Sequence, residues 1–122
     1  MINKVDLNSD KDYTFSSCVE AGDYVFTSHQ GGRLDSDSFE VQLDACFQRL
    51  AKTLKAVDLT LDDVVKVNLL LKDIDDFRKT KDIFRKYFKN GFPARSTITT
   101  EFVTPKILVQ IDAVAFKGEG GK

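Results

Sequence analysis

The spacing of apolar residues along the first half of the chain predicts a β-hairpin followed by a long helix. Residues 24–28 are rich in β-formers and follow the tight turn at 21–23, so with residues 13–19 they predict the hairpin. Ser36 to Ser38 then offers candidate N-caps for a helix. Beyond them, apolar residues recur at intervals of three and four, which is typical of an amphipathic helix with one buried side: Phe39, Leu43, Cys46, Phe47, Leu50, Leu54 and Val57.

The second half predicts a central strand, a second helix and two further strands. Residues 60–63 resemble a capping box that opens one short turn. The apolar run 64–71 is too short and too β-branched for a core helix, so it predicts a central strand. The strands that end the domain are predicted at 96–100 and 107–116. Between them and the central strand, a second helix ends at Asn90-Gly91, a plausible C-cap, and has the apolar stripe Phe77, Thr80, Phe84, Tyr87 and Phe88.

The element order ββαβαββ predicts an α+β fold with one sheet. Each predicted helix has a single apolar stripe to bury, so both are expected to pack on the same face of the sheet. A chain of 122 residues has enough length for one ordinary core, and we expect a single domain over 1–122. Segments 1–10 and 117–122 are expected to be flexible.

The other face of the predicted sheet mixes polar and aliphatic side chains. In the last strand, alternate residues place Gln110 and Asp112 opposite the purely apolar set Ile107, Val109, Ile111, Ala113 and Ala115. In the central strand, Lys66 and Asn68 likewise oppose the apolar set Val65, Val67, Leu69 and Leu71. A face of mixed character suits contact with another subunit better than full exposure to water.

Composition removes several classes of function. Eighteen basic and nineteen acidic residues leave the chain near neutrality, without the basic footprint of a nucleic-acid binder. The sequence has no apolar run long enough to span a bilayer and no signal-peptide pattern at its start, so a cytoplasmic protein without membrane contact is expected. Cys18 and Cys46 lack metal-ligand spacing, and Cys46 falls on the apolar helix face. Neither a metal nor a cofactor is expected.

Two segments carry the chemistry: residues 92–97, which contain Arg95, and residues 107–113, which contain Gln110. Together they resemble the signature of the RidA (YjgF) family of reactive-intermediate deaminases, small trimeric proteins that hydrolyse enamines and imines derived from amino acids. The resemblance covers nearly the whole chain. It implies a chorismate-mutase-like domain, a barrel-like homotrimer with three clefts between subunits, and a small carboxylate as ligand.

The family pattern carries over to this chain in part. The resemblance implies that Arg95 holds the substrate carboxylate, for which its planar fork is suited. Ser28 matches the family's Thr-Ser-Gly-Gln strand end, where the Ser lies beside the ligand. The other pocket positions depart from the pattern: Phe15 stands where many members have Tyr, His29 where they have Gly, Lys81 where Asn is common, and Gln110 where typical deaminases have Glu.

The change at Gln110 matters most for the chemistry. Imine hydrolysis needs an activated water, a proton for the departing nitrogen and a fixed carboxylate. A carboxylate takes a proton from water, whereas an amide can only orient the water. General acid–base catalysis raises the reaction rate by about 10²–10⁴-fold, so its loss would leave a slow enzyme. Asp112, on the same strand face, and His29, the only histidine, are the candidate replacements. The plainer readings are a pair between Asp112 and Lys66, and a loop position for His29.

Three functions stay open at this point. The first is a deaminase that converts 2-imino or enamine acids to 2-keto acids and ammonia. The second is a non-catalytic or regulatory binder of small carboxylates such as 2-keto acids, which Gln110, Phe15 and Lys81 favour. The third, nucleic-acid cleavage, is a label that some family members carry, and the lack of a basic, aromatic-rich surface argues against it. The basic stripe on the second helix is assigned to solvent: Arg78, Lys81, Arg85 and Lys89.

Overall fold

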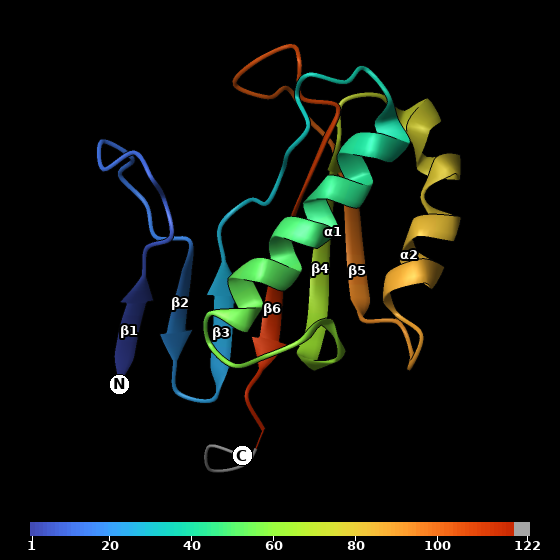
Figure 1. Ribbon diagram of the computed structural model, residues 1–122. Helices are drawn as coiled ribbons and strands as arrows, with labels where there is room; N and C mark the ends of the chain where they lie inside the picture. Colours follow the sequence, from blue (N-terminus) through green and yellow to red (C-terminus); the bar gives the residue numbers. More distant parts are fainter. Residues whose placement is uncertain (119–122) are drawn as a thin grey trace.

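The computed structural model describes residues 1–118 of the chain as one six-stranded sheet with helices on one face (Figure 1). The strands lie in the order β1-β2-β3-β6-β4-β5, and β4 and β5 are the parallel pair. The element order is β1 (Ile2–Val5), β2 (Cys18–Ala21), β3 (Tyr24–Thr27), α1 (Phe39–Lys55), β4 (Val64–Leu71), α2 (Lys81–Tyr87), β5 (Ala94–Thr99) and β6 (Val109–Phe116), with the 3-10 helices η1 (Leu61–Asp63) and η2 (Ile74–Lys79). The predicted α+β fold is confirmed.

The core lies between the sheet and α1, which crosses β3, β6 and β4 (Figure 1). Helix α1 begins after Ser38, whose side chain accepts a hydrogen bond from the backbone of Val41, so one of the predicted N-caps is in place. Its predicted apolar stripe is buried, as is the alternate apolar set of β6. Burial raises the pKa of the Cys46 thiol to about 12, so Cys46 is a small core residue rather than a nucleophile.

Strand β4 has the predicted bounds, but the residue that points into the core at its start differs from the prediction. Val65 was expected in the core and is instead exposed, whereas Val64 is buried. The reason is an irregularity in the pairing of β4 with β6 between Val64 and Lys66. An extra residue at such a point reverses the alternation of side chains on one side of it. From Val67 onward the alternation follows the prediction.

The second helical region is divided into η2 and α2. Asp73 caps η2 by accepting a hydrogen bond from the backbone of Asp75. At the junction, the buried Thr80 hydroxyl donates to the carbonyl of Phe77 over 2.8 Å, and such local bonds compete with a continuous α-helix. Three aromatic residues of the predicted stripe pack inward against α1, where the ring of Phe47 lies 5.1–5.5 Å from the rings of Phe84, Tyr87 and Phe88. Phe77, predicted in the same stripe, is 40% exposed and lies outside the core.

The N-terminal segment contains a strand that the apolar pattern did not predict. Strand β1 pairs antiparallel with β2 at the edge of the sheet, and Figure 1 shows both extending beyond the helices. Residues 13–17, expected to belong to the first hairpin strand, lie in the loop before β2. The hairpin itself is confirmed, with Gly22 at φ +59° in its turn. Residues 119–122 of the tail expected to be flexible lie outside the described part.

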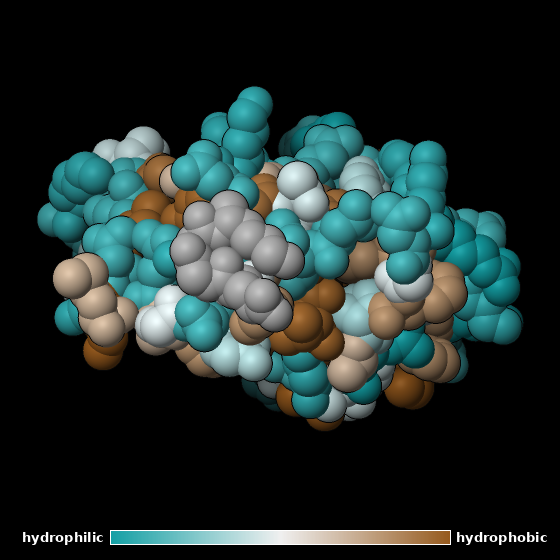
Figure 2. Space-filling view, turned by 90° about the horizontal axis from the view of Figure 1, so that it is seen from below, coloured by the Kyte–Doolittle hydropathy of each residue, from teal (hydrophilic) through white to brown (hydrophobic). Residues whose placement is uncertain are grey.

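The face of the sheet opposite the helices, here called the open face, carries exposed apolar side chains. Tyr24, Phe26 and Ile98 are 42%, 47% and 57% exposed, and Phe26 lies opposite Val114 in the sheet. Lys66, Asn68, Gln110 and Asp112 share this face and are half-buried, so the mixed character that the sequence predicted is present. Figure 2 shows the molecule from below, looking at one end of the sheet, where brown apolar surface is interrupted by teal hydrophilic surface. Within residues 1–118, no helix has the length and apolar content to cross a membrane.

Candidate functional site

The segment that follows β3 is fixed to β6 by backbone and side-chain bonds. The backbone of Gln30 donates to Ile111 over 2.6 Å and accepts from it over 3.1 Å. The buried Gln30 side chain accepts from the Thr53 hydroxyl of α1 and donates to the carbonyl of Ser28. The Thr27 hydroxyl accepts from the backbone of Ala113. His29 therefore stands between two anchored residues, and its backbone position is set by the core.

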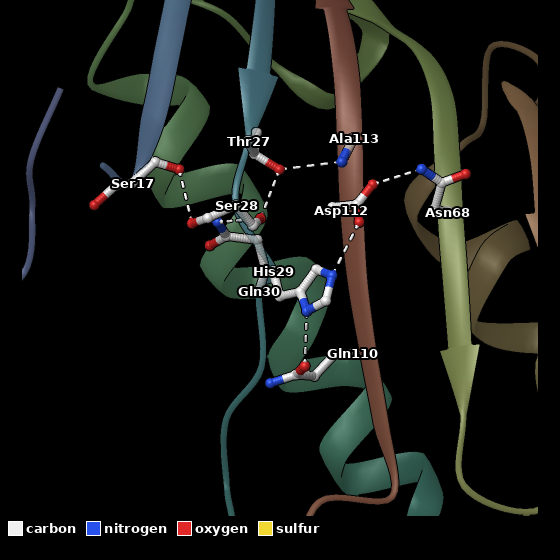
Figure 3. A network of polar contacts seen from close by, with 9 residues as sticks. All are labelled: Ser17, Thr27, Ser28, His29, Gln30, Asn68, Gln110, Asp112 and Ala113. Atoms are coloured by element: carbon white, nitrogen blue, oxygen red, sulfur yellow. Dashed lines mark hydrogen bonds and ion pairs between the residues drawn. The ribbon is translucent and has the colours of Figure 1, made fainter. Parts of the chain in front are cut away.

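The imidazole of His29 lies between two side chains of β6 on the open face (Figure 3). Its Nδ1 is 3.0 Å from Oε1 of Gln110, and its Nε2 is 3.3 Å from Oδ2 of Asp112. The amide of Asn68 on β4 donates to the other carboxylate oxygen of Asp112 over 2.7 Å. The His29 side chain is 50% exposed and that of Asp112 22%, so the imidazole is fixed but reachable from solvent.

This geometry suits both protonation states of His29. With the Gln110 oxygen toward Nδ1, both ring nitrogens face acceptors, and an imidazolium satisfies both of them. A half-turn of the Gln110 amide brings its NH₂ group toward Nδ1, and the neutral ring then accepts from Gln110 and donates to Asp112. A glutamate at this position would have no such second orientation, because both of its carboxylate oxygens only accept hydrogen bonds.

Ser28 and Phe15 lie outside this network. The Ser28 hydroxyl donates to the carbonyl of Ser17 over 3.1 Å, so it ties the strand end to the loop before β2. Phe15 lies in that loop, 53% exposed, with its ring stacked on Tyr13 at 5.5 Å. Of the plainer readings, the pairing of Asp112 with Lys66 is not what the structure has, because its partners are His29 and Asn68.

Arg95 lies at the other end of the sheet, on the edge strand β5. Its guanidinium carbon is 4.9 Å from the ring centre of Phe84 and 5.2 Å from that of Phe77. It lines a hollow of about 410 Å³ with Lys81, Arg85, Phe92 and Pro93. Within residues 1–118, no carboxylate forms an ion pair with Arg95.

Arg95 and Gln110 lie on opposite faces of the sheet within one chain. Arg95 pairs in register with Val67, which points into the core beneath the helices. Gln110 pairs with Leu70, three residues further along β4 and therefore on the open face. The predicted site residues thus form two groups, His29 with Gln110 and Asp112, and Arg95 with Lys81.

Several residues of these groups escaped the sequence analysis. Arg85 was assigned to the solvated stripe of the second helix. Its spacing of four residues from Lys81 could have predicted that both lie on one helix face. Phe77 and Phe84 were read as core positions and also support Arg95. The described residues include no group of three or more His, Cys, Asp or Glu side chains arranged to hold a metal ion.

Comparison with known proteins places this geometry in context. Residues 8–117 match the family described as Endoribonuclease L-PSP. The human 2-iminobutanoate/2-iminopropanoate deaminase is 32% identical over 87 residues, which cover 71% of this chain and 64% of the human protein. A RutC family protein of Pyrococcus horikoshii is 28% identical over 109 residues, covering 84% of this chain and 86% of the relative.

Solved structures agree with the sequence comparison. A Streptococcus pyogenes protein described as a member of the yjgF family superposes with a TM-score of 0.84 at 31% identity, and the match covers 94% of this chain and 95% of that one. The fold, the sequence match and the Pro-Ala-Arg segment all lead to one assignment. The chain belongs to the Endoribonuclease L-PSP family, the RidA (YjgF) family that its sequence resembles.

Proposed function

We propose that this protein hydrolyses 2-imino and enamine acids to 2-keto acids and ammonia, with His29 and Asp112 in place of the carboxylate that Gln110 replaces. The observation that carries this proposal is the position of the imidazole, 3.0 Å from Gln110 and 3.3 Å from Asp112. Histidine changes charge near neutral pH and is the commonest acid–base catalyst in proteins. The named activity of the human relative supports the reaction class.

Each step of the proposed reaction has a group to perform it. The guanidinium of Arg95 holds the substrate carboxylate. Asp112 accepts from Nε2 of His29 and so keeps Nδ1 as the basic nitrogen. The Gln110 amide turns from Nδ1 to a water, and this water then donates to the freed nitrogen. Nδ1 takes a proton from this water as its oxygen bonds to the imine carbon. The same nitrogen passes this proton to the imine nitrogen, which becomes an amine. Nδ1 then relays the remaining hydroxyl proton to the amine, so the carbonyl forms as the C–N bond breaks, and a 2-keto acid and ammonia leave.

The two groups of residues act together only if they come from different chains. Because Arg95 and Gln110 occupy opposite faces of one sheet, we propose a homotrimer in which Arg95 and Lys81 of one subunit face His29 and Gln110 of the next. The exposed Tyr24, Phe26 and Ile98 on the open face support burial against a neighbour. We also propose a cytoplasmic location, in keeping with free thiols at Cys18 and Cys46.

A second candidate function is the binding of 2-keto acids without turnover. The neutral amide at Gln110 and the missing hydroxyl at Phe15 favour it, since neither group can donate or accept a proton in the reaction. Arg95 would keep its role as carboxylate clamp in this case. The two candidates therefore share a pocket and differ in whether His29 acts on a bound water.

The deciding experiment follows the decay of freshly generated 2-iminopropionate with wild-type protein, Arg95→Ala and no protein. We expect acceleration by the wild type, and loss of it in Arg95→Ala with thermal stability and oligomeric state retained. Arg78→Ala is the matched control, because it removes a cation from the same region without touching the hollow. Binding of pyruvate by folded wild type without any acceleration would establish the binder instead. Full activity in Arg95→Ala would remove Arg95 from the site.

A further inference from the structure

The hollow beside Arg95 is lined by charges of one sign. Three of its six lining residues are cationic, Lys81, Arg85 and Arg95, and the other three are Phe84, Phe92 and Pro93. In residues 1–118, Lys81 and Arg95 have no ion pair, and the pair of Arg85 with Asp82 is long at 3.9 Å between side chains that are 68% and 98% exposed. Such a pair contributes little. Three positive charges therefore meet at one apolar-walled hollow without an acidic neighbour in its lining.

This arrangement differs from that of four other hollows on the described residues. All four are lined by both signs of charge, as expected for a chain with a net charge of −1. Their charged residues include Lys72 with Asp73, Glu40 with Arg33, Asp35 with Lys106, and Lys55 with Asp62. A concave site with one sign of charge and apolar walls concentrates ions of the opposite sign.

The positions of Lys81 and Arg85 also oppose the stability of α2. They are four residues apart on the same helix face, where like charges repel. Lys81 is moreover the first residue of the helix, the end at which the helix dipole disfavours a cation. Neither residue gains a close carboxylate partner in return. A ligand that neutralises both charges would account for this unfavourable placement.

We propose that the ligand of this protein carries a second anionic group, which Lys81 and Arg85 bind while Arg95 holds the carboxylate next to the imine. The inference rests on the proposed function, because it takes Arg95 as the clamp of a 2-imino or 2-keto acid. A simple imino acid neutralises one of the three cations and leaves two uncompensated. An imino acid with a second carboxylate or a phosphate on its side chain neutralises the hollow more fully, and its aliphatic middle section packs on Phe84 and Phe92.

The test compares two 2-keto acids of nearly equal shape by calorimetric titration of the assembled protein. 2-Oxoglutarate carries a terminal carboxylate, and 5-methyl-2-oxohexanoate has an isopropyl group in its place. We expect the dianion to bind at least about tenfold more tightly, as for hydrogen bonds to charged groups. In the double variant Lys81→Gln, Arg85→Gln this preference should disappear, mainly through weaker binding of the dianion. The double variant Arg78→Gln, Lys89→Gln is the control, since it removes the same charge outside the hollow.

The outcomes separate this inference from the proposed function. Binding of both keto acids with equal affinity, lost in Arg95→Ala, would overturn the second anionic site and leave the carboxylate clamp intact. Absence of binding by either compound would overturn both. An equal loss of preference in the control variant would show a general charge effect and would likewise overturn the inference. Tighter binding of 2-oxo-4-phosphonobutanoate than of 2-oxoglutarate would support it and identify phosphate as the second group.

Discussion

The open face around His29 and the hollow around Arg95 use their polar side chains in opposite ways. On the open face, both nitrogens of His29 and both carboxylate oxygens of Asp112 have partners in the same chain. In the hollow, Arg95 lies on two aromatic rings and Lys81 has no anionic partner among residues 1–118. In the first region the charged groups already have partners within the chain, whereas the second has charges that only a ligand or a neighbouring subunit can neutralise.

This difference indicates that the open face serves catalysis and the hollow serves binding. A network whose bonds are already made holds its groups in place before substrate arrives, which is what acid–base chemistry requires. Cations supported by rings and left without carboxylates keep their attraction for an incoming anion. We therefore expect substitutions on the open face to change turnover and substitutions in the hollow to change binding.

The largest expected effect is that of His29→Asn on turnover. The substitution removes the proposed base while an amide still reaches toward Gln110 or Asp112, so the fold should be retained. We expect the rate of 2-iminopropionate hydrolysis to fall about 10²-fold or more, the usual contribution of a general base. The affinity for pyruvate should change little, because Arg95 is untouched.

Asp112→Asn provides the comparison within the same network. Asp112 acts through the imidazole, so its loss should lower the rate less than the loss of His29. A wild-type rate in His29→Asn at equal stability would exclude the histidine as base. The dependence of turnover on the open face would then have to rest on Asp112 or Gln110.

The sequence predicted the fold where one face of an element had to be buried. The period of α1 and the alternation of β6 both follow from burial against a single core, so their inward residues were predictable. The orientation of Val65 was not predictable, because it depends on an irregular pairing with β6 that the local sequence pattern does not reveal. Strand β1 was missed for a related reason: its four residues are exposed or half-buried and carry no apolar alternation.

The candidate site was predicted as a set of residues but not as an arrangement. Period two placed Gln110 and Asp112 on one face correctly, since strand alternation is local. The location of His29 between them depends on the bonds of Gln30 to Ile111, which join positions far apart in the chain. The separation of Arg95 from Gln110 across the sheet follows from the parallel register of β5 with β4, which is likewise a tertiary feature.

An intermediate effect is expected for Gln110→Glu, which restores the family's carboxylate beside His29. A glutamate can take the proton from water itself, so we expect imine hydrolysis to rise by about tenfold, within the range of a positioned base. The imidazole between two carboxylates should then stay charged and become dispensable. The double variant Gln110→Glu, His29→Asn tests this, because it should keep most of the gain. An unchanged rate in the single variant at matched stability would show that position 110 is not where a base is missing.

The smallest expected effect belongs to Phe77, one of the two rings that support Arg95. Phe77 is 40% exposed and its ring centre lies 5.2 Å from the guanidinium carbon, so Phe77→Leu removes that contact with little loss of core packing. A cation–π contact at an exposed site contributes about 0.5–1 kcal/mol, which corresponds to roughly two- to fivefold weaker binding of pyruvate. Turnover at saturating substrate should stay near that of the wild type.

Val103→Ala is the matched control for Phe77→Leu, because Val103 is 99% exposed and lies outside the hollow. Titration of both variants with pyruvate, together with their rates at saturation, separates the two regions of the molecule. A fall in saturated rate without a change in affinity would mean that Phe77 positions Arg95 for the chemical step. The division between a binding hollow and a catalytic open face would then be incorrect, since the hollow would take part in the reaction itself.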